Sequence, residues 1–375
     1  MVICIDVSER TKQELDSLVD LGTYRDYAEA ISIAISNQLV LQRQVSKTGP
    51  VVIPTSVESQ ADNPPKPAKV EDVRKSRTWS KPSVPTLFSV RTPYNQLSGP
   101  AHFPDDVFAN GQAVPVDRWT FGQHNKLLPA KASCRGLAAL LSRVENGAGV
   151  LIPKATSDIA ENAVGLGDYL RALDLKYGLN RDDAFSTAFP SSGSESEDKA
   201  RLRYASQFVA AISKQGQLTG FLVDLKLINQ VRGKSPKLVL TEAGWEFAKI
   251  PSSVLDVENG NERPPKLTDQ EISFLLQHIA THVPAEDFAY RTVLDAVLHG
   301  ADTPERLDKI LREHLPVRGE KPFTDAFLST QRSGAISRMN DLDLIHRTRN
   351  GIRVTYVVSP NGKQYLQKML RSVAL

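Results

Sequence analysis

Arginines gather near the carboxyl end of the chain, among hydroxyl and amide side chains. Five of them fall between positions 332 and 353. A guanidinium group presents a planar fork of N–H donors that matches both a phosphate and the edge of a guanine. This composition favours contact with a nucleic acid; a protein-binding or merely soluble basic surface is the alternative. The candidate contacts are Arg332, Ser333, Ser337, Arg338, Asn340, Arg347, Arg349 and Arg353.

A helix and a hairpin are predicted to position these side chains. The sequence predicts a helix, two strands and a closing helix, ending near residue 370. This order is that of a winged helix, in which the helix before the hairpin enters the major groove and the hairpin tip meets the backbone. The first five candidates would lie on the helix and the last three on the wing. Three further helices are expected upstream, at 268–282, 285–299 and 303–315.

The same plan is predicted once more at residues 219–250. A helix with Phe221 and Leu222 precedes a strand, a basic turn, the strand KLVLT and a closing helix. The segments TGFL, LKLI and LVLTEAGWEF match SGAI, LDLI and YVVSPNGKQY, so we interpret the chain as holding two similar units. Arg232 and Lys234 would contact DNA from the turn. The sequence LT-x-x-G after the second strand resembles the MarR-like winged-helix proteins.

The amino-terminal stretch 2–42 is predicted to be a strand followed by two helices. Residues 2–7 alternate, so the apolar residues at odd positions share one face. Ser8 is a suitable N-cap for the first helix, and the second helix has a broad apolar face. A unit this small cannot bury a core alone, so it needs a second copy of itself. The expected dimer interface comprises Ile3, Ile5, Val7, Ile31 and Ile35.

This amino-terminal order resembles the ribbon-helix-helix family of dimeric DNA-binding proteins over about the first 45 residues. The resemblance rests on the strand, the Ser-Glu start of the first helix, the turn LGTYRDYAEAI and the apolar second helix. It implies an antiparallel ribbon that presents Val2, Cys4 and Asp6 to DNA, with a phosphate held near Arg25. Asp6 would repel an anionic partner, so the unit is expected to act above all as the dimer clamp.

A linker and a helical region are predicted between these units. Residues 46–83 form a proline-rich basic stretch around Trp79, which is typical of a flexible linker. Gln123, His124 and Asn125 are interpreted as polar residues that tie a loop to the helix after them. Helices are expected at 131–144, 157–176, near 181–188 and at 197–214.

Composition argues against several other classes of protein. Cys4 and Cys134 are the only cysteines, which excludes a disulfide framework and a cysteine-rich zinc site and fits a reducing cytoplasm. His278 and His282 lack a third metal ligand, and no phosphate-binding loop or nucleophile motif is present. No apolar run is long enough to span a bilayer, and no cleavable leader opens the chain. We expect a cytoplasmic protein without enzymatic activity or cofactor.

The 375 residues, with 41% hydrophobic content, predict a mainly α protein with small β elements. A net charge of +3 is too small to establish nucleic-acid binding by itself, so any basic surface must be local. The favoured function is a homodimeric, sequence-specific transcriptional regulator that binds double-stranded DNA. The alternative is a dimeric adaptor whose winged helices hold a partner protein. The predicted parts are a ribbon-helix-helix module at 1–45, the linker at 46–83, a helical domain ending in a winged helix at 84–255, and a second winged helix at 266–375.

Overall fold

A computed structural model of the chain describes residues 83–89, 113–144, 149–193, 196–231, 235–256, 262–313, 324–351 and 353–373. The chain divides into two units, Met1–Ser76 and Arg77–Leu375, and every described residue lies in the second. This unit is mainly helical with small antiparallel sheets, as predicted. The predicted ribbon-helix-helix module and almost all of the predicted linker lie outside the described residues. None of the described helices is long and apolar enough to cross a membrane.

Two long helices begin earlier than the sequence predicted. Helix α3 spans Leu127–Leu141 and every one of its residues is buried. Pro129 lies in its first turn, where the missing N–H breaks no helical hydrogen bond, so this proline does not delay the helix. Helix α4 spans Ile152–Lys176 and likewise accepts a proline at its start. Strand β1, Val150–Leu151, connects the two.

The segment after α4 differs from its prediction in two places. No helix forms near 181–188, where the chain makes turns. The helix expected at 197–214 is instead α5, Glu197–Tyr204, continued by the π-helical turn Ala205–Val209. It ends there because the chain becomes extended at Ala210 and enters a small hairpin. The two strands of that hairpin are β2, Ala211–Ile212, and β3, Leu218–Thr219.

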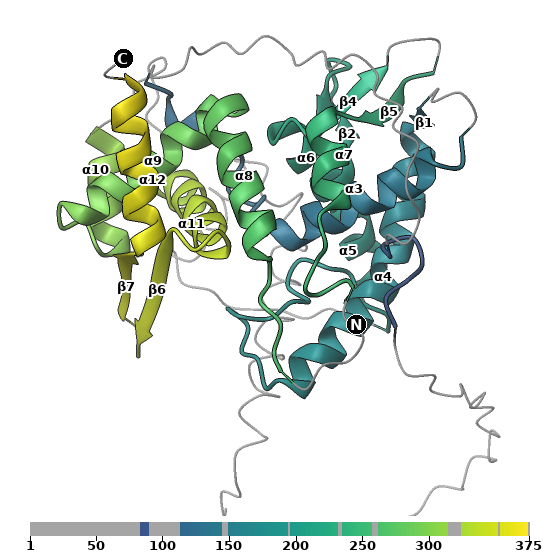
Figure 1. Ribbon diagram of the computed structural model, residues 1–375, viewed down its shortest axis with the longest axis horizontal. Helices are drawn as coiled ribbons and strands as arrows, with labels where there is room; N and C mark the ends of the chain where they lie inside the picture. The colour runs from purple at the N-terminus through teal and green to yellow at the C-terminus, as the bar shows by residue number, and fades with distance from the viewer. Residues whose placement is uncertain are drawn as a thin grey trace, which may run out of the picture. The chain divides into compact units, whose positions relative to one another are not determined.

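Both predicted hairpins and their closing helices are confirmed (Figure 1). The first hairpin, formed by β4 Ile228–Val231 and β5 Lys237–Leu240, follows the four-residue helix α6, Phe221–Asp224. Strand β1 joins it to make a three-stranded sheet in the order β1-β5-β4. The second is a separate two-stranded sheet that extends beyond the helices beside it in Figure 1. The elements of the first unit are α6 Phe221–Asp224, β4 Ile228–Val231, β5 Lys237–Leu240 and α7 Glu242–Lys249. Those of the second are α8 Asp269–His282, α9 Pro284–Leu298, α10 Pro304–Glu313, α11 Asp325–Asp341, β6 Ile345–Asn350, β7 Arg353–Val358 and α12 Pro360–Val373.

The two units repeat each other in the hydrogen bonds that close their hairpins. Thr241 Oγ1 donates to the carbonyl of Lys226 at 2.9 Å, and Ser359 Oγ donates to the carbonyl of Asp343 at 2.5 Å. Lys226 and Asp343 occupy the same left-handed conformation, each with φ of 55°. The match between LKLI and LDLI in the sequence therefore marks the same backbone turn in both units.

A glycine in each closing helix completes the repeat. A Cβ on Gly244 would lie 2.0 Å from the carbonyl oxygen of Leu227, and one on Gly362 would lie 2.2 Å from that of Leu344. The closing helix therefore rests directly on the backbone that precedes the first strand. Any larger residue would push the helix away from the hairpin. This close approach is what the aligned glycines of the two sequence segments specify.

Candidate nucleic-acid interface

The β6–β7 hairpin presents arginines on both of its faces. Arg347 lies opposite Tyr356, and Arg349 lies opposite Val354, so these four side chains share one face. Arg353 falls on the other face because side chains alternate along a strand. All three arginines are exposed. The hairpin can therefore meet a polyanion edge-on, with guanidinium groups on either side of its plane.

The second face of this hairpin is polar. Thr348 and Thr355 form a cross-strand hydrogen bond, with 2.9 Å between their hydroxyl oxygens. Residues 344–358 include three arginines and one histidine but no carboxylate. The nearest acid along the chain is Asp343 at the base, whose Oδ1 lies 3.7 Å from His346 Nε2. Positive charge along the hairpin is therefore not neutralised from within.

Contacts with other parts of the chain distinguish the three hairpin arginines. Arg347 Nη1 lies 3.7 Å from Asp182 Oδ1, a weak pair in which both side chains are largely in water. Arg349 and Arg353 form no ion pair with any described residue. These two flank the tip of the hairpin, which makes them the best placed cations for contact with phosphate.

Arg332 has a different role from the predicted one. It is 7% exposed, and its Nε lies 2.7 Å from Asp308 Oδ1 on α10. Its Nη1 donates to the hydroxyl of Tyr356 at 2.9 Å, and its Nη2 donates to Ser329 Oγ at the same distance. Burial raises the pKa of the Tyr356 hydroxyl, which therefore stays neutral as an acceptor. Arg332 fixes β7 against α10 and α11, and we remove it from the set of DNA contacts.

Arg338 is also removed from that set because its side chain has no exposure to solvent. Its guanidinium makes a bidentate ion pair with Glu286, which is equally buried, and the Nη2–Oε2 distance is 3.0 Å. Its Nη1 donates to the carbonyl of His124 at 2.8 Å. Arg338 thus joins α11 to α9 and to the loop before α3, and none of its donors reaches the surface.

One face of helix α11 is packed against the loop before α3, so that face cannot contact DNA. Gln331 Nε2 donates to the carbonyl of Val116 at 3.1 Å. A Cβ on Gly334 would lie 2.3 Å from the carbonyl oxygen of Gly122, so the helix and that loop touch backbone to backbone. Of the other predicted contacts on α11, Ser333 is exposed, and Ser337 and Asn340 are half-buried. The helix cannot enter a major groove through the face that the sequence suggested.

The corresponding helix of the first unit is still less suited to reading DNA. Phe221 and Leu222 of α6 are fully buried. Asp224 Oδ2 lies 2.8 Å from His124 Nδ1, and the His124 ring is packed among aromatic side chains. His124 therefore ties its loop to α6, and not to the helix after it as the sequence suggested. Arg232 and Lys234 of the first wing lie outside the described residues, as do Arg25 and the expected dimer interface of Ile3, Ile5, Val7, Ile31 and Ile35.

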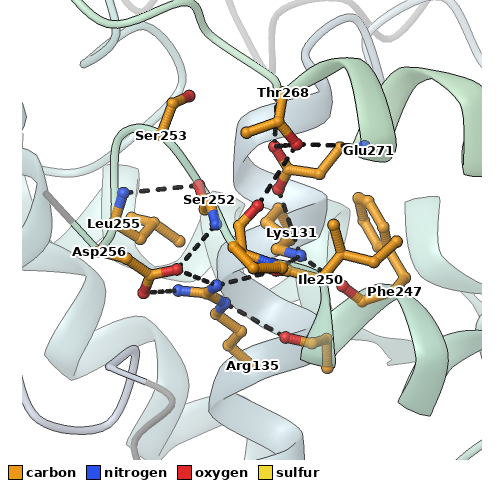
Figure 2. Close-up of polar contacts among 12 residues, drawn as sticks. Lys131, Arg135, Phe247, Ile250, Ser252, Ser253, Leu255, Asp256, Thr268 and Glu271 are labelled. Carbon is orange, nitrogen blue, oxygen red and sulfur yellow. Dashed lines mark hydrogen bonds and ion pairs between the residues drawn. The ribbon is translucent and has the colours of Figure 1, made fainter.

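A buried lysine fixes the segment between α7 and α8 onto α3 (Figure 2). Lys131 Nζ donates to the carbonyl of Ile250 at 2.6 Å and to that of Phe247, and it lies 3.2 Å from Glu271 Oε1. Burial lowers the pKa of Lys131 to about 8. Two backbone carbonyls accept hydrogen bonds from the ammonium, and the buried carboxylate of Glu271 lies beside its charge. Lys131 is a structural residue and not a candidate nucleophile.

Arg135, one turn later on α3, anchors the same segment (Figure 2). Its guanidinium makes two hydrogen bonds to the carboxylate of Asp256, at 2.6 and 2.7 Å. Burial tends to raise the pKa of Asp256, but the hydrogen bonds from Arg135 and the Ser252 N–H, together with the nearby positive charges, outweigh it and leave that pKa below its ordinary value. Sequence reasoning missed both contacts, because Lys131 and Arg135 have the spacing of the polar side of an amphipathic helix.

His278 and Cys134 also occupy structural positions. His278 Nε2 lies 2.8 Å from the carbonyl oxygen of Leu225, and its ring packs against Phe274. Among the described residues, no cluster of three histidine, cysteine or acidic side chains could hold a metal ion. Cys134 is buried, and burial raises its pKa to about 12, which keeps the thiol protonated and inert.

Comparison of the chain with protein-family models, with curated proteins and with solved structures finds no match. Its function must therefore be inferred from the site itself.

Proposed function

We propose that this chain is a homodimeric DNA-binding protein that acts as a transcriptional regulator, with the β6–β7 hairpin as its main DNA contact. The observation that carries the proposal is the hairpin itself. It has no carboxylate between residues 344 and 358, and Arg349 and Arg353 flank its tip without an ion-pair partner among the described residues. Guanidinium groups held in this way suit the phosphates on either side of a groove.

The order of elements around each hairpin supports a winged-helix assignment for both units. In the first, β1 lies between α3 and α4 and pairs with β5, which makes a three-stranded sheet with the wing. In the second, α11 leads into β6 and β7, and α12 closes the unit. Because α11 is covered, we assign DNA contact to the wing and not to the helix that precedes it.

The amino-terminal 45 residues complete the proposal as a ribbon-helix-helix dimer clamp. A dimer would carry two such hairpins, and the second would bind at a raised effective concentration once the first had bound. The two-fold symmetry of the protein would then be matched by a two-fold DNA site. A reducing cytoplasm, which the two cysteines of the chain would tolerate, suits this role.

The test is the salt dependence of DNA binding by the full chain. Fluorescently labelled duplexes, selected from a random pool, are titrated between about 50 and 200 mM salt, the range over which counterion release changes affinity strongly. The slope of log K against log salt is negative, and in the variant R347A/R349A/R353A it should become shallower by about 0.9 for each phosphate that no longer contacts an arginine. Selection from the pool also reveals the spacing of half-sites.

A matched control removes the same charge elsewhere. Lys154, Arg201 and Arg306 each lie in an exposed ion pair within one helix or at its start. The variant K154A/R201A/R306A should retain the wild-type slope. Equal slopes for the hairpin variant and the wild type would contradict the assignment of the hairpin.

A protein-binding adaptor is the second candidate, and the coverage of α11 favours it. The faces expected to read bases are packed within the unit, through Arg332, Arg338 and Gly334. An adaptor would show no salt-sensitive retention of any duplex at low ionic strength. The same titration therefore separates the two functions.

A further inference from the structure

A polar cleft of about 650 Å³ lies between segments of the described chain that are distant in sequence. One wall is formed by α5 and the π-helical turn after it, and the other by the first half of α11 together with the loop before α3. Its volume is within the range of sites that hold small organic molecules. The cleft lies apart from the hairpin residues discussed above, none of which lines it.

The cleft has one positively charged side chain, and its other polar groups are hydroxyls and amides that can donate hydrogen bonds. Arg203 lines it with an exposed guanidinium that makes no ion pair with the described residues. Asn125 and Ser333 line it as well, and no carboxylate does. Gln207 Nε2 donates to Gln123 Oε1 at 2.9 Å across the cleft, which leaves the amide N–H groups of Gln123 free for another acceptor. Such a set of groups matches an anion.

Two features of the backbone mark the same place. Ala188 lines the cleft in a left-handed conformation, with φ of 75°, which residues other than glycine rarely adopt. The five-residue π-helical turn, closed by a hydrogen bond of 3.0 Å from Ala210 N to Ala205 O, contributes Gln207. π-Helical turns and strained residues occur preferentially where a protein binds a ligand.

We propose that this cleft binds a small organic anion, through Arg203 on one wall and Ser333 with Asn125 on the other. Carboxylates and phosphate monoesters share the required chemistry, since both accept several hydrogen bonds from a guanidinium and from neutral donors. The aromatic residues Phe189 and Phe208, also at the cleft, provide an apolar surface for the carbon skeleton. A bound anion would join α5 to α11, the helix that leads into the arginine hairpin.

The experiment is a calorimetric titration of the full chain without DNA, so its outcome does not depend on the proposed function. Succinate represents the carboxylates, glycerol 3-phosphate represents the phosphate monoesters, and glycerol is the neutral control. We expect saturable binding of at least one anion and none of glycerol. The variant R203A should weaken the affinity about tenfold, which corresponds to the loss of one charge-assisted hydrogen bond.

Two further variants locate the site. Arg201 lies on the same helix, pairs with Asp198 at 2.9 Å and does not line the cleft, so R201A should bind as the wild type does. Ser333 is exposed on the opposite wall, so S333L should fill the cleft and abolish binding without disturbing the core. Absence of binding by both anions, or equal affinity in R203A and the wild type, would overturn the proposal.

Discussion

Replacement of Arg338 by methionine tests the structural role that its burial implies. The side chain makes three hydrogen bonds, two to the carboxylate of Glu286 and one to the carbonyl of His124. Methionine fills most of the space but offers none of these donors. The change therefore leaves a carboxylate with no exposure to solvent and no cation beside it.

The expected loss in the free energy of unfolding is about 3–5 kcal/mol, the cost of removing one partner from a buried ion pair. Three charge-assisted hydrogen bonds at about 1.5 kcal/mol each give a similar figure. A second change, E286L, removes the stranded carboxylate. The double variant R338M/E286L should therefore lose about 2–3 kcal/mol less stability than the sum of the losses in the two single variants, and this difference is the coupling energy of the pair.

Urea denaturation of the four proteins of this double-mutant cycle measures these differences directly. The control is R306M, which removes an arginine from an exposed pair with Asp302 and should cost less than about 1 kcal/mol. DNA retention per folded molecule should be the same in R338M and the wild type. If R338M lost less than about 1 kcal/mol of stability and also retained DNA more weakly than the wild type, the structural role would be refuted and Arg338 would again be a candidate DNA contact.

Two other changes probe the packing. G334A should destabilise the protein by about 1–3 kcal/mol, because its Cβ would lie 2.3 Å from the carbonyl oxygen of Gly122. The matched change G165A, in the interior of α4 with its nearest neighbour at 3.4 Å, should instead stabilise it by up to about 1 kcal/mol, and thermal unfolding distinguishes the two. Burial lowers the pKa of Lys131 from 10.5 to about 8, so between these pH values the unfolded chain binds a proton that the folded chain does not. The free energy of unfolding of the wild type, relative to that of K131M, should therefore rise from about pH 8 to about pH 10.5, and a fall would contradict the buried position of Lys131.

Local patterns predicted the hairpins and their flanking helices. The positions of α8, α9 and α10 agree with the apolar periodicity to within two residues. The aligned segments LKLI and LDLI each contain a residue at φ of 55°, so the internal repeat was visible in the sequence before its geometry was known. Turns, caps and periodicity are local, and a sequence reports them directly.

Which face of a helix is covered by a distant part of the chain could not be predicted in the same way. Arg332 and Arg338 have the spacing of a basic exposed stripe, yet Asp308 and Glu286 on other helices hold them. The partners are 24 and 52 residues away in sequence, beyond the reach of any local pattern. One signal was present, since Gly334 lies within a predicted helix, where glycine usually marks a close packing contact. The cleft lined by Arg203 had no signal, because four separate segments form it.

The backbone contact between Gly122 and Gly334 has a consequence for how such a chain could evolve. A domain that can be exchanged between proteins must present a complete surface when it is cut free. The carboxyl-terminal unit, α8 to α12, would instead expose the α11 face that carries Gln331, Gly334 and the Arg338–Glu286 pair. Recombination between α7 and α8 would leave both halves with an unmatched surface. We therefore expect these two halves to be inherited together, and any homologue to retain small residues at both glycine positions.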